Sequence, residues 1–356
     1  MIATRDQVCL VELSQRIAQL PRFRVARLPT PLDEAPRLSQ VLGGVNVFIK
    51  REDMTGLAFG GNKTRELDFF VGDARNANAD VFIAGGGVTQ SNHAVQCAAA
   101  ARRAGMLPVA VLHGSHSDEP QGNLLLSRLL DVDVRLVDTS TIDSIIYRRD
   151  ALHWLMQDIA SEFRARGHRP YVLRSSFHPL GVVGYVSAFI ELAEQISDRN
   201  IELDHLYLAS VGATHVGLAL GAKHLGYPCK VTGINYALEA IGLRDRMKTL
   251  AEEAAKMLGI TTRLDDDDLA IANFAGPGYG LTTPESIEAI KLLAKTEGVF
   301  LDPVYTGKGM AGLLAHVHDG RVRPGETVVF VHTGGTPALF AYNSELLKAD
   351  RRREGI

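Results

Sequence analysis

A lysine that follows a glycine-bearing loop is the first residue of this sequence that could bond covalently to a ligand. The segment FIKREDMTGLAFGGNKTREL spans 48–67 and places Lys63 directly after Gly60, Gly61 and Asn62. Glycines permit positive φ angles and a close approach of the backbone to a ligand. A lysine presented there, once its amine is neutral, attacks a carbonyl carbon and forms a Schiff base. A surface lysine at the start of a helix explains the same residues without a function.

The same loop does not match a nucleotide-binding P-loop, which requires G-x-x-x-x-G-K-[ST]. Counting from Gly56 places the second glycine at Gly61, but the next residue is Asn62 and not lysine. The P-loop pattern therefore fails by one residue, which favours the Schiff-base interpretation.

A second glycine-rich loop carries polar residues that could bind an anion. The segment IAGGGVTQSNHAVQCAAAA, residues 83–101, runs from an apolar stretch through three glycines and polar residues into an alanine-rich helix. Ser91 or Asn92 is expected to cap that helix. The unpaired amides at a helix N-terminus favour an anion such as a carboxylate. Helix capping alone explains the pattern equally well.

These loops need a scaffold to bring them together, and the alternation of elements predicts an α/β fold. Short apolar runs typical of buried strands lie at 81–86, 108–113, 133–137, 171–175, 205–210, 230–235 and 327–332. Segments with helical spacing lie at 65–77, 92–105, 121–130, 143–166, 184–197, 214–226, 243–258, 284–297, 308–318 and 337–348. Such alternation predicts a mostly parallel sheet with ligands beyond the carboxyl ends of its strands.

The composition argues against several classes of protein. A length of 356 residues suits two domains or one large α/β unit, and a net charge of −3 with mixed signs does not favour nucleic-acid binding. The three cysteines, at positions 9, 97 and 229, are widely spaced, which argues against disulfides or a structural metal and fits a reducing cytoplasm. Charged residues near the N-terminus leave no signal-peptide core, and the alanine-rich stretch is too short to cross a membrane. We therefore expect a cytoplasmic protein without a membrane partner.

Six segments, in the same order, resemble the family of 1-aminocyclopropane-1-carboxylate deaminases and D-cysteine desulfhydrases. They are GLAFGGNKTREL, the QSNH loop, GATHVGLALG (212–221), GPGYG (276–280), LDPVYTGKGMAGL (301–313) and HTGGTPALFAY (332–342). The resemblance covers roughly residues 25 to 345 and implies pyridoxal 5'-phosphate as the cofactor. It also implies the tryptophan-synthase-β-like fold (fold type II), an α/β fold with two open, twisted, mostly parallel sheets in two domains and the cofactor between them.

The domain boundaries follow from this resemblance. A large cofactor-binding domain is expected to comprise residues 1–65 and 176–356, of which 1–25 form an N-terminal extension. The small domain is expected to comprise residues 66–175. A homodimer is expected as well, because closed two-fold assemblies are the common case.

The resemblance also implies which residues bind the cofactor. Lys63 holds it as an imine, and Asn62 lies beside that lysine. The expected phosphate cradle consists of Val211, Gly212, Ala213 and Thr214, which is reasonable because amides at a helix start attract a dianion. Asn92 is expected to bond to the phenolic oxygen, Tyr305 to pack on the pyridine face and Thr333 to meet the ring nitrogen.

The catalytic and substrate-binding residues are expected to lie on the same loops. Ser91 would contact the substrate carboxylate or lie beside Cα, and Tyr279 would approach the reacting carbon. The expected catalytic residues are Lys63, Ser91, Tyr279 and Tyr305, and the expected substrate-binding residues are Thr89, Ser91, Asn92 and His93. Without the resemblance, the sequence favours both tyrosines as core residues whose hydroxyls form hydrogen bonds within the protein.

Two threonines distinguish the branches of the family. The cyclopropane deaminases carry a glutamate after the tyrosine, where this sequence has Thr306, and the desulfhydrases meet the ring nitrogen with a threonine that corresponds to Thr333. A hydroxyl partner makes the ring a weaker electron sink, which suits β-elimination. The resemblance therefore implies β-elimination from a small amino acid such as D-cysteine, yielding pyruvate, sulfide and ammonia.

One departure keeps other substrates open. Val95 stands where the family carries an arginine, so a fixed set of donors is absent near the expected cleft. The alternatives are an L-cysteate sulfo-lyase, a 1-aminocyclopropane-1-carboxylate deaminase, or a non-catalytic cofactor- or nucleotide-binding α/β protein.

Overall fold

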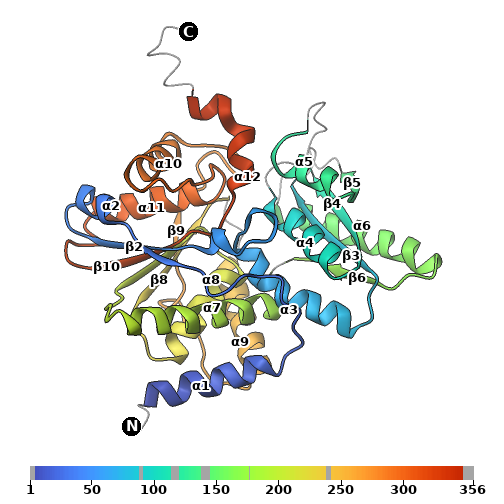
Figure 1. Cartoon of the computed structure of the whole chain (residues 1–356), viewed down its shortest axis with the longest axis horizontal. Helices are drawn as coiled ribbons and strands as arrows, with labels where there is room; N and C mark the ends of the chain where they lie inside the picture. Colours follow the sequence, from blue (N-terminus) through green and yellow to red (C-terminus); the bar gives the residue numbers. More distant parts are fainter. Residues whose placement is uncertain are drawn as a thin grey trace.

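The chain builds two sheets that lie side by side (Figure 1). The computed structural model describes residues 5–87, 91–113, 120–137, 145–175, 177–237 and 242–347. One sheet has six strands in the order β1-β2-β10-β7-β8-β9, and the other has four in the order β5-β4-β3-β6. Every neighbouring pair is parallel except β1 with β2. The expected α/β architecture with two mostly parallel sheets is confirmed.

The strands end close to where the sequence predicts. The six-stranded sheet contains β1 (Leu32–Glu34), β2 (Asn46–Lys50), β7 (His205–Leu208), β8 (Lys230–Asn235), β9 (Ala270–Asn273) and β10 (Thr327–Val331). The four-stranded sheet contains β3 (Val81–Gly87), β4 (Leu107–His113), β5 (Asp133–Val137) and β6 (Pro170–Leu173). The seven predicted apolar runs all form strands, and β2 is the strand that leads into the lysine loop. Strands β1 and β9 escaped prediction because they are short edge strands, whose pairing partner rather than their own pattern determines them.

The predicted helices also form, with two differences. They are α3 (Asn62–Asn76), α4 (Asn92–Arg103), α5 (Gly122–Leu129), α6 (Ile145–Ala165), α7 (Pro179–Asp198), α8 (Ala213–His224), α9 (Leu243–Leu258), α10 (Pro284–Glu297) and α11 (Thr306–His318). The segment expected as one helix at 337–348 is instead α12 (Thr336–Leu339), the 3-10 turn η3 (Phe340–Tyr342) and a further helical stretch to residue 347. Helices α1 (Arg5–Ala18) and α2 (Pro36–Val41) were not predicted.

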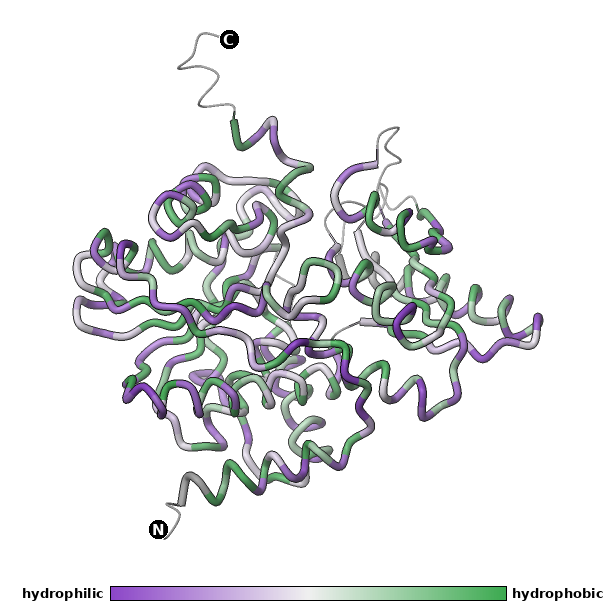
Figure 2. The backbone as a smooth tube through the Cα atoms, in the orientation of Figure 1, coloured by the Kyte–Doolittle hydropathy of each residue, from purple (hydrophilic) through white to green (hydrophobic). Residues whose placement is uncertain are grey.

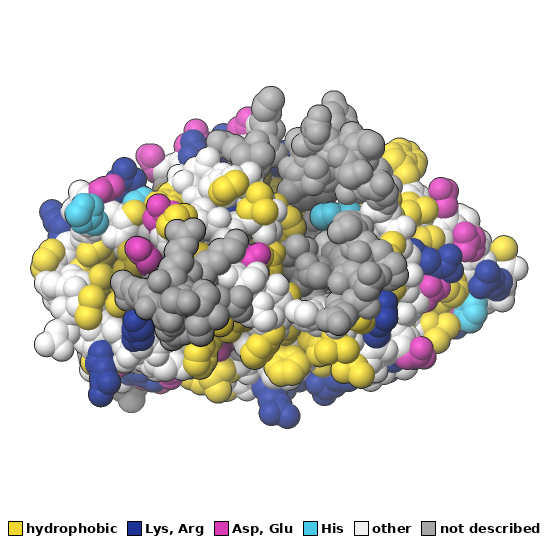
Figure 3. All heavy atoms as spheres, turned by 90° about the horizontal axis from the view of Figure 1, so that it is seen from above, with side chains coloured by type: hydrophobic (Ala, Val, Ile, Leu, Met, Phe, Trp, Pro, Cys, Tyr) yellow, Lys and Arg dark blue, Asp and Glu magenta, His cyan; other side chains and the backbone are white. Residues whose placement is uncertain are grey.

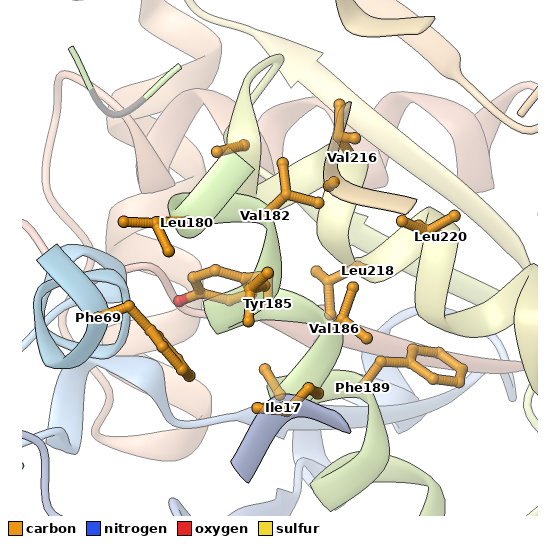
Figure 4. Close-up of a cluster of buried hydrophobic side chains, with 14 of the residues drawn as sticks. Ile17, Phe69, Leu180, Val182, Tyr185, Val186, Phe189, Val216, Leu218 and Leu220 are labelled. Carbon is orange, nitrogen blue, oxygen red and sulfur yellow. The ribbon is translucent and has the colours of Figure 1, made fainter. Parts of the chain in front are cut away.

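Helix α7 is the centre of the larger core. Its side chains Tyr185 and Phe189 are completely buried and pack against α8 (Figure 4). A Cβ at Gly217 of α8 would lie 2.4 Å from the Cβ of Tyr185, so only glycine permits this approach. The close packing of α7 on α8 holds the start of α8 rigidly at the carboxyl end of β7.

The N-terminal segment is part of this core. Helix α1 alternates hydrophobic and hydrophilic residues (Figure 2), and its Leu13 and Ile17 are buried in the same cluster as α7. Arg16 donates to the carbonyl oxygen of Gly259 at 2.9 Å, at the end of α9. No helix among the described residues is long and apolar enough to cross a membrane. On the face shown in Figure 3, acidic and basic side chains are interspersed around the edge.

Candidate active site

The loop before α3 has a strained backbone that sets the position of Lys63. Four consecutive residues have positive φ, with Ala58 at 47°, Phe59 at 66°, Gly60 at 73° and Gly61 at 134°. A Cβ on Gly60 would lie 1.8 Å from the carbonyl oxygen of Asp53, so this position requires glycine. Lys63 is the second residue of α3. Such strain, held by surrounding structure, is characteristic of functional loops.

Three distant segments converge on Gly61. The amide of Asn62 donates to the carbonyl oxygen of Thr333 at 3.0 Å, and a Cβ on Gly334 would lie 2.6 Å from Gly61 Cα. From α4, Gln96 Nε2 donates to the carbonyl oxygen of Gly60. The loop at 60–63 therefore contacts both α4 and the loop at 333–335, and Thr333 is buried.

Lys63 belongs to a small polar network with the start of α8. Its Nζ lies 3.1 Å from Glu66 Oε1, and its side chain is 19% exposed. Thr214 Oγ1 donates to the same Glu66 oxygen at 3.0 Å, and Asn62 Nδ2 donates to Thr214 Oγ1 at 2.9 Å. The structure thus brings together Asn62, Lys63 and Thr214, which the sequence analysis had placed in one site.

The start of α8 could hold a phosphate. Gly212 is its N-cap, and a Cβ there would make ordinary van der Waals contact with the ring of Phe177 at 3.6 Å. The first amides of an α-helix have no partner within the helix and attract anions. The residues expected to hold the phosphate, Val211, Gly212, Ala213 and Thr214, lie at this helix start, and Thr214 and Lys63 share Glu66 as a partner. His215 instead packs against β8, with its Nε2 3.3 Å from the carbonyl oxygen of Val231.

The start of α4 carries the second group of expected residues. Ser91 is the N-cap and accepts from the amide of Ala94 at 3.2 Å, while Asn92 Oδ1 accepts from Asn123 Nδ2 at 3.1 Å. The ring of His93 lies 3.7 Å from Cys97 Sγ, and burial together with the charge of Lys63 lowers the pKa of His93 to about 3. His93 is therefore neutral at neutral pH. Thr89 lies outside the described residues.

The two expected tyrosines lie together. The hydroxyls of Tyr279 and Tyr305 share a hydrogen bond, and the centroids of their rings are 5.9 Å apart. The ring of Tyr236 packs edge-on against Tyr305 at 4.7 Å. Burial raises the pKa of Tyr279 and of Tyr305, so both phenols keep their protons at neutral pH.

Asp302 orders the start of α11 and fixes Thr306. Its carboxylate accepts from the amides of Val304, Tyr305 and Thr306, and also from Thr306 Oγ1 at 2.7 Å. A Cβ on Gly335 would lie 2.3 Å from Asp302 Oδ1, which places this turn against the loop that contacts Gly61. The loop at 333–335 therefore connects the lysine side of the site to the tyrosine side.

Sequence reasoning missed two charged residues beside the site. Lys308 Nζ donates to the carbonyl oxygens of Ala275 and Gly278 at 2.7 and 2.9 Å, which holds the loop that bears Tyr279. Burial lowers the pKa of Lys308 to about 8. Glu66, three residues after Lys63, could have been found from that spacing, because residues i and i+3 of a helix are neighbours. Nothing in the sequence near Lys308 indicates which carbonyls it meets.

A buried ionic network lies behind the lysine, on the other side of α3. Arg65 pairs with Glu52 at 2.7 Å and with Glu191 at 3.1 Å, and Lys50 pairs with Glu191 at 2.5 Å. Burial raises the pKa of Glu52, but the charges of Arg65 and Lys50 more than offset this and leave it at about 2. Tyr185 also donates to Glu52, at 3.0 Å. The network anchors both ends of the strained loop to α7.

Comparisons with known proteins agree with this geometry. Residues 24–334 match the family described as pyridoxal-phosphate dependent enzymes. The chain is 38% identical to a D-cysteine desulfhydrase of Salmonella choleraesuis (strain SC-B67), over 92% of this chain and 98% of that protein. It is 37% identical to a D-cysteine desulfhydrase of Klebsiella pneumoniae (strain 342), over 93% and 99% of the two chains.

Solved structures agree as well. A crystal structure described as an ACC deaminase homologue superimposes with a TM-score of 0.86 and 33% identity, covering 95% of this chain and 98% of that one. Threonine deaminase isoform 2 from Solanum lycopersicum shares the fold, with a TM-score of 0.64 and 18% identity over 97% and 89% of the chains. The extent of these matches, together with a lysine that shares a hydrogen-bonded network with the start of α8, leads to one conclusion: the chain belongs to the pyridoxal-phosphate-dependent enzyme family.

Proposed function

We propose that this enzyme removes the thiol and the amino group of D-cysteine, with Lys63 as the residue that bonds to the cofactor's aldehyde carbon. The observation that carries the proposal is the placement of Lys63 Nζ in one hydrogen-bonded network with Thr214 at the start of α8. The names of the relatives from Salmonella and Klebsiella support the choice of substrate. When bound, pyridoxal phosphate supplies the electron sink, and the protein supplies orientation and proton transfer.

Each group of side chains has an assigned task. Lys63, as a neutral amine, takes the proton from Cα of the substrate. The amides at the start of α4, with Ser91 and Asn92, hold the substrate carboxylate. The phenols of Tyr279 and Tyr305 remain protonated, so they can donate to the departing sulfur. The three-carbon fragment that remains after sulfide leaves still carries the amino nitrogen, and it hydrolyses to pyruvate and ammonia.

The surroundings of Thr306 support elimination over ring opening. Its hydroxyl already donates to Asp302, and its amide does the same, so this residue forms part of a buried turn. Thr333 is then assigned as the hydroxyl opposite the ring nitrogen. We also assign His93 and Thr89 to the substrate side of the site, and the residue ranges 1–65 with 176–356 and 66–175 to the two domains.

The assembly and location belong to the same proposal. A homodimer is expected by analogy with the general preference for closed two-fold assemblies. The three cysteines, all within the described residues, form no disulfide, which suits a reducing cytoplasm. Light scattering at several protein concentrations tests the dimer, and a monomer at all of them would contradict it.

The test of the activity uses the visible absorbance and the products. The purified protein with added pyridoxal phosphate should be yellow, and borohydride should bleach it and fix the cofactor on Lys63, as read by peptide mass spectrometry. D-cysteine should give pyruvate and sulfide, while Lys63→Ala should give neither and Lys256→Ala, an exposed lysine, should behave as wild type. A colourless protein, or good turnover of the cyclopropane amino acid but not of D-cysteine, would contradict the proposal.

A further inference from the structure

Glu66 carries the wrong charge for a site that holds a phosphate. Its side chain is 1% exposed, and its Oε1 lies 3.1 Å from Lys63 Nζ and accepts from Thr214 Oγ1 at 3.0 Å. Its second oxygen, Oε2, is buried without a hydrogen-bond partner among the described residues. A buried oxygen without a partner costs free energy and is uncommon in folded proteins.

The proposed function removes both partners of this carboxylate. Lys63 must become a neutral amine to bond to an aldehyde, so its charge can no longer offset that of Glu66. A phosphate at the start of α8 competes for the hydroxyl hydrogen of Thr214. The phosphate also places a dianion close to Glu66, and a buried carboxylate beside a like charge binds a proton instead of remaining ionised.

We propose that Glu66 is the proton acceptor for Lys63, and that its carboxyl stays neutral while the cofactor is bound. The inference rests on the proposed role of Lys63. An N–H bond of the Lys63 ammonium breaks and an O–H bond forms on Glu66, so the two buried charges cancel. The amine nitrogen then bonds to the aldehyde carbon, and the aldehyde oxygen leaves as water with the two remaining amine hydrogens.

The other groups around Glu66 do not replace Lys63 in this exchange. Burial, with a smaller contribution from the charge of Glu66, raises the pKa of Cys97 on α4. Burial also raises the pKa of Tyr185 on α7 well above its ordinary value, so both groups remain neutral. His93 is neutral for the reason given above. Burial raises the pKa of Glu66 itself, which favours the protonated form once the Lys63 charge is gone.

The protonated carboxyl gains a role that the carboxylate lacks. A carboxylate only accepts hydrogen bonds, whereas a carboxylic acid also donates one. The proton gives Glu66 a donor to direct at the phosphate or at Thr214. Glu66 thereby becomes a positioning residue for the cofactor, selecting a ligand with a phosphate at one end and an aldehyde at the other.

Infrared difference spectroscopy of cofactor binding tests this directly. Adding pyridoxal phosphate to cofactor-free enzyme should produce a carboxylic-acid carbonyl band that shifts in heavy water. The band should be absent in Glu66→Gln and present in Glu288→Gln, an exposed glutamate on α10. A visible absorption band without the carboxylic-acid band overturns the role of Glu66 alone. Absence of the visible band in the wild type overturns the proposed function instead.

The rate at which the visible band appears gives a second readout. In Glu66→Gln the proton of Lys63 must leave to solvent, so the rate should rise by about tenfold per pH unit through the neutral range, because only the neutral amine reacts. The wild type and Glu288→Gln should show a shallower dependence. Equal rates for all three proteins at every pH would overturn the proposal.

Discussion

The first turns of α3 contribute to two groups of paired acidic and basic side chains. The groups differ in how completely their carboxylates are hydrogen-bonded. Arg65 lies in a network with Glu52 and Glu191 in which both carboxylates accept several hydrogen bonds. Lys63 and Glu66, on another side of the helix, form a pair in which one carboxylate oxygen has no partner among the described residues. A saturated network has one stable arrangement, whereas an unsaturated pair can exchange its proton. We infer that the network of Arg65 stabilises the fold and that the pair of Lys63 and Glu66 takes part in the reaction.

The largest expected effect comes from removing the lysine of the unsaturated pair. Lys63→Ala should lower the rate of pyruvate formation from D-cysteine by at least about 10⁴-fold, because both the covalent link and the base are lost. The free energy of unfolding should change little, since the lysine side chain is partly exposed. Steady-state kinetics and urea unfolding measure the two quantities. A large loss of stability in Lys63→Ala would contradict the inference that this pair contributes to the reaction and not to the stability of the fold.

Removing the guanidinium of Arg65 from the saturated network should chiefly lower the free energy of unfolding. Arg65→Met removes the guanidinium that pairs with two buried carboxylates and leaves only Lys50 beside them, so the free energy of unfolding should fall by about 3–5 kcal/mol. The control is Arg323→Met, which breaks an exposed pair with Glu326 and should cost less than about 1 kcal/mol. If the two variants unfold at the same urea concentration, the network does not stabilise the fold.

The contributions of Glu52 and Glu66 to the free energy of unfolding should change with pH in opposite directions. The pKa of Glu52 is lowered from 4.5 to about 2, so its stabilisation is complete above about pH 4.5 and is lost as the pH falls toward 2. Over that window the free energy of unfolding should fall by about 3 kcal/mol from this group, a loss that Glu52→Gln should remove.

Glu66 has a raised pKa, so the folded state binds its proton more tightly than the unfolded state does. Its contribution to stability is therefore greatest at low pH and declines as the pH rises through the raised pKa. Glu66→Gln should flatten the stability profile on that side. Urea unfolding at a series of pH values measures both slopes, and identical profiles for the two variants would contradict the assignment.

The smallest expected effect is at Ser91, which has a structural role as a helix cap and a proposed role in substrate binding. Ser91 caps α4 through the amide of Ala94, so Ser91→Ala should cost about 1 kcal/mol of stability. If Ser91 also contacts the substrate carboxylate, the variant should raise KM for D-cysteine, whereas the cap of α10 tested by Thr283→Ala should leave KM unchanged. A normal KM in Ser91→Ala would restrict this residue to capping.

Much of the scaffold could be predicted because local patterns determine it. The predicted strands at 81–86 and 108–113 form β3 and β4, and the segment predicted to be helical at 284–297 forms α10 with the same bounds. The glycines before Lys63 predicted positive φ angles, and the φ angles of 73° at Gly60 and 134° at Gly61 confirm this. The roles of the individual site residues remain predictions, although the structure places Asn62, Lys63 and Thr214 together.

Residue order and local chemistry were enough to identify the α/β class, the order of the loops and the lysine that distinguishes this chain from a P-loop protein. Only the tertiary structure decided that Gly334 lies against Gly61, that Lys308 holds the loop of Tyr279, and that Glu66 meets Thr214. The reason is physical. Strand and helix patterns depend on neighbours within a few residues, whereas the pKa and the partners of a buried charge depend on what the fold packs around it.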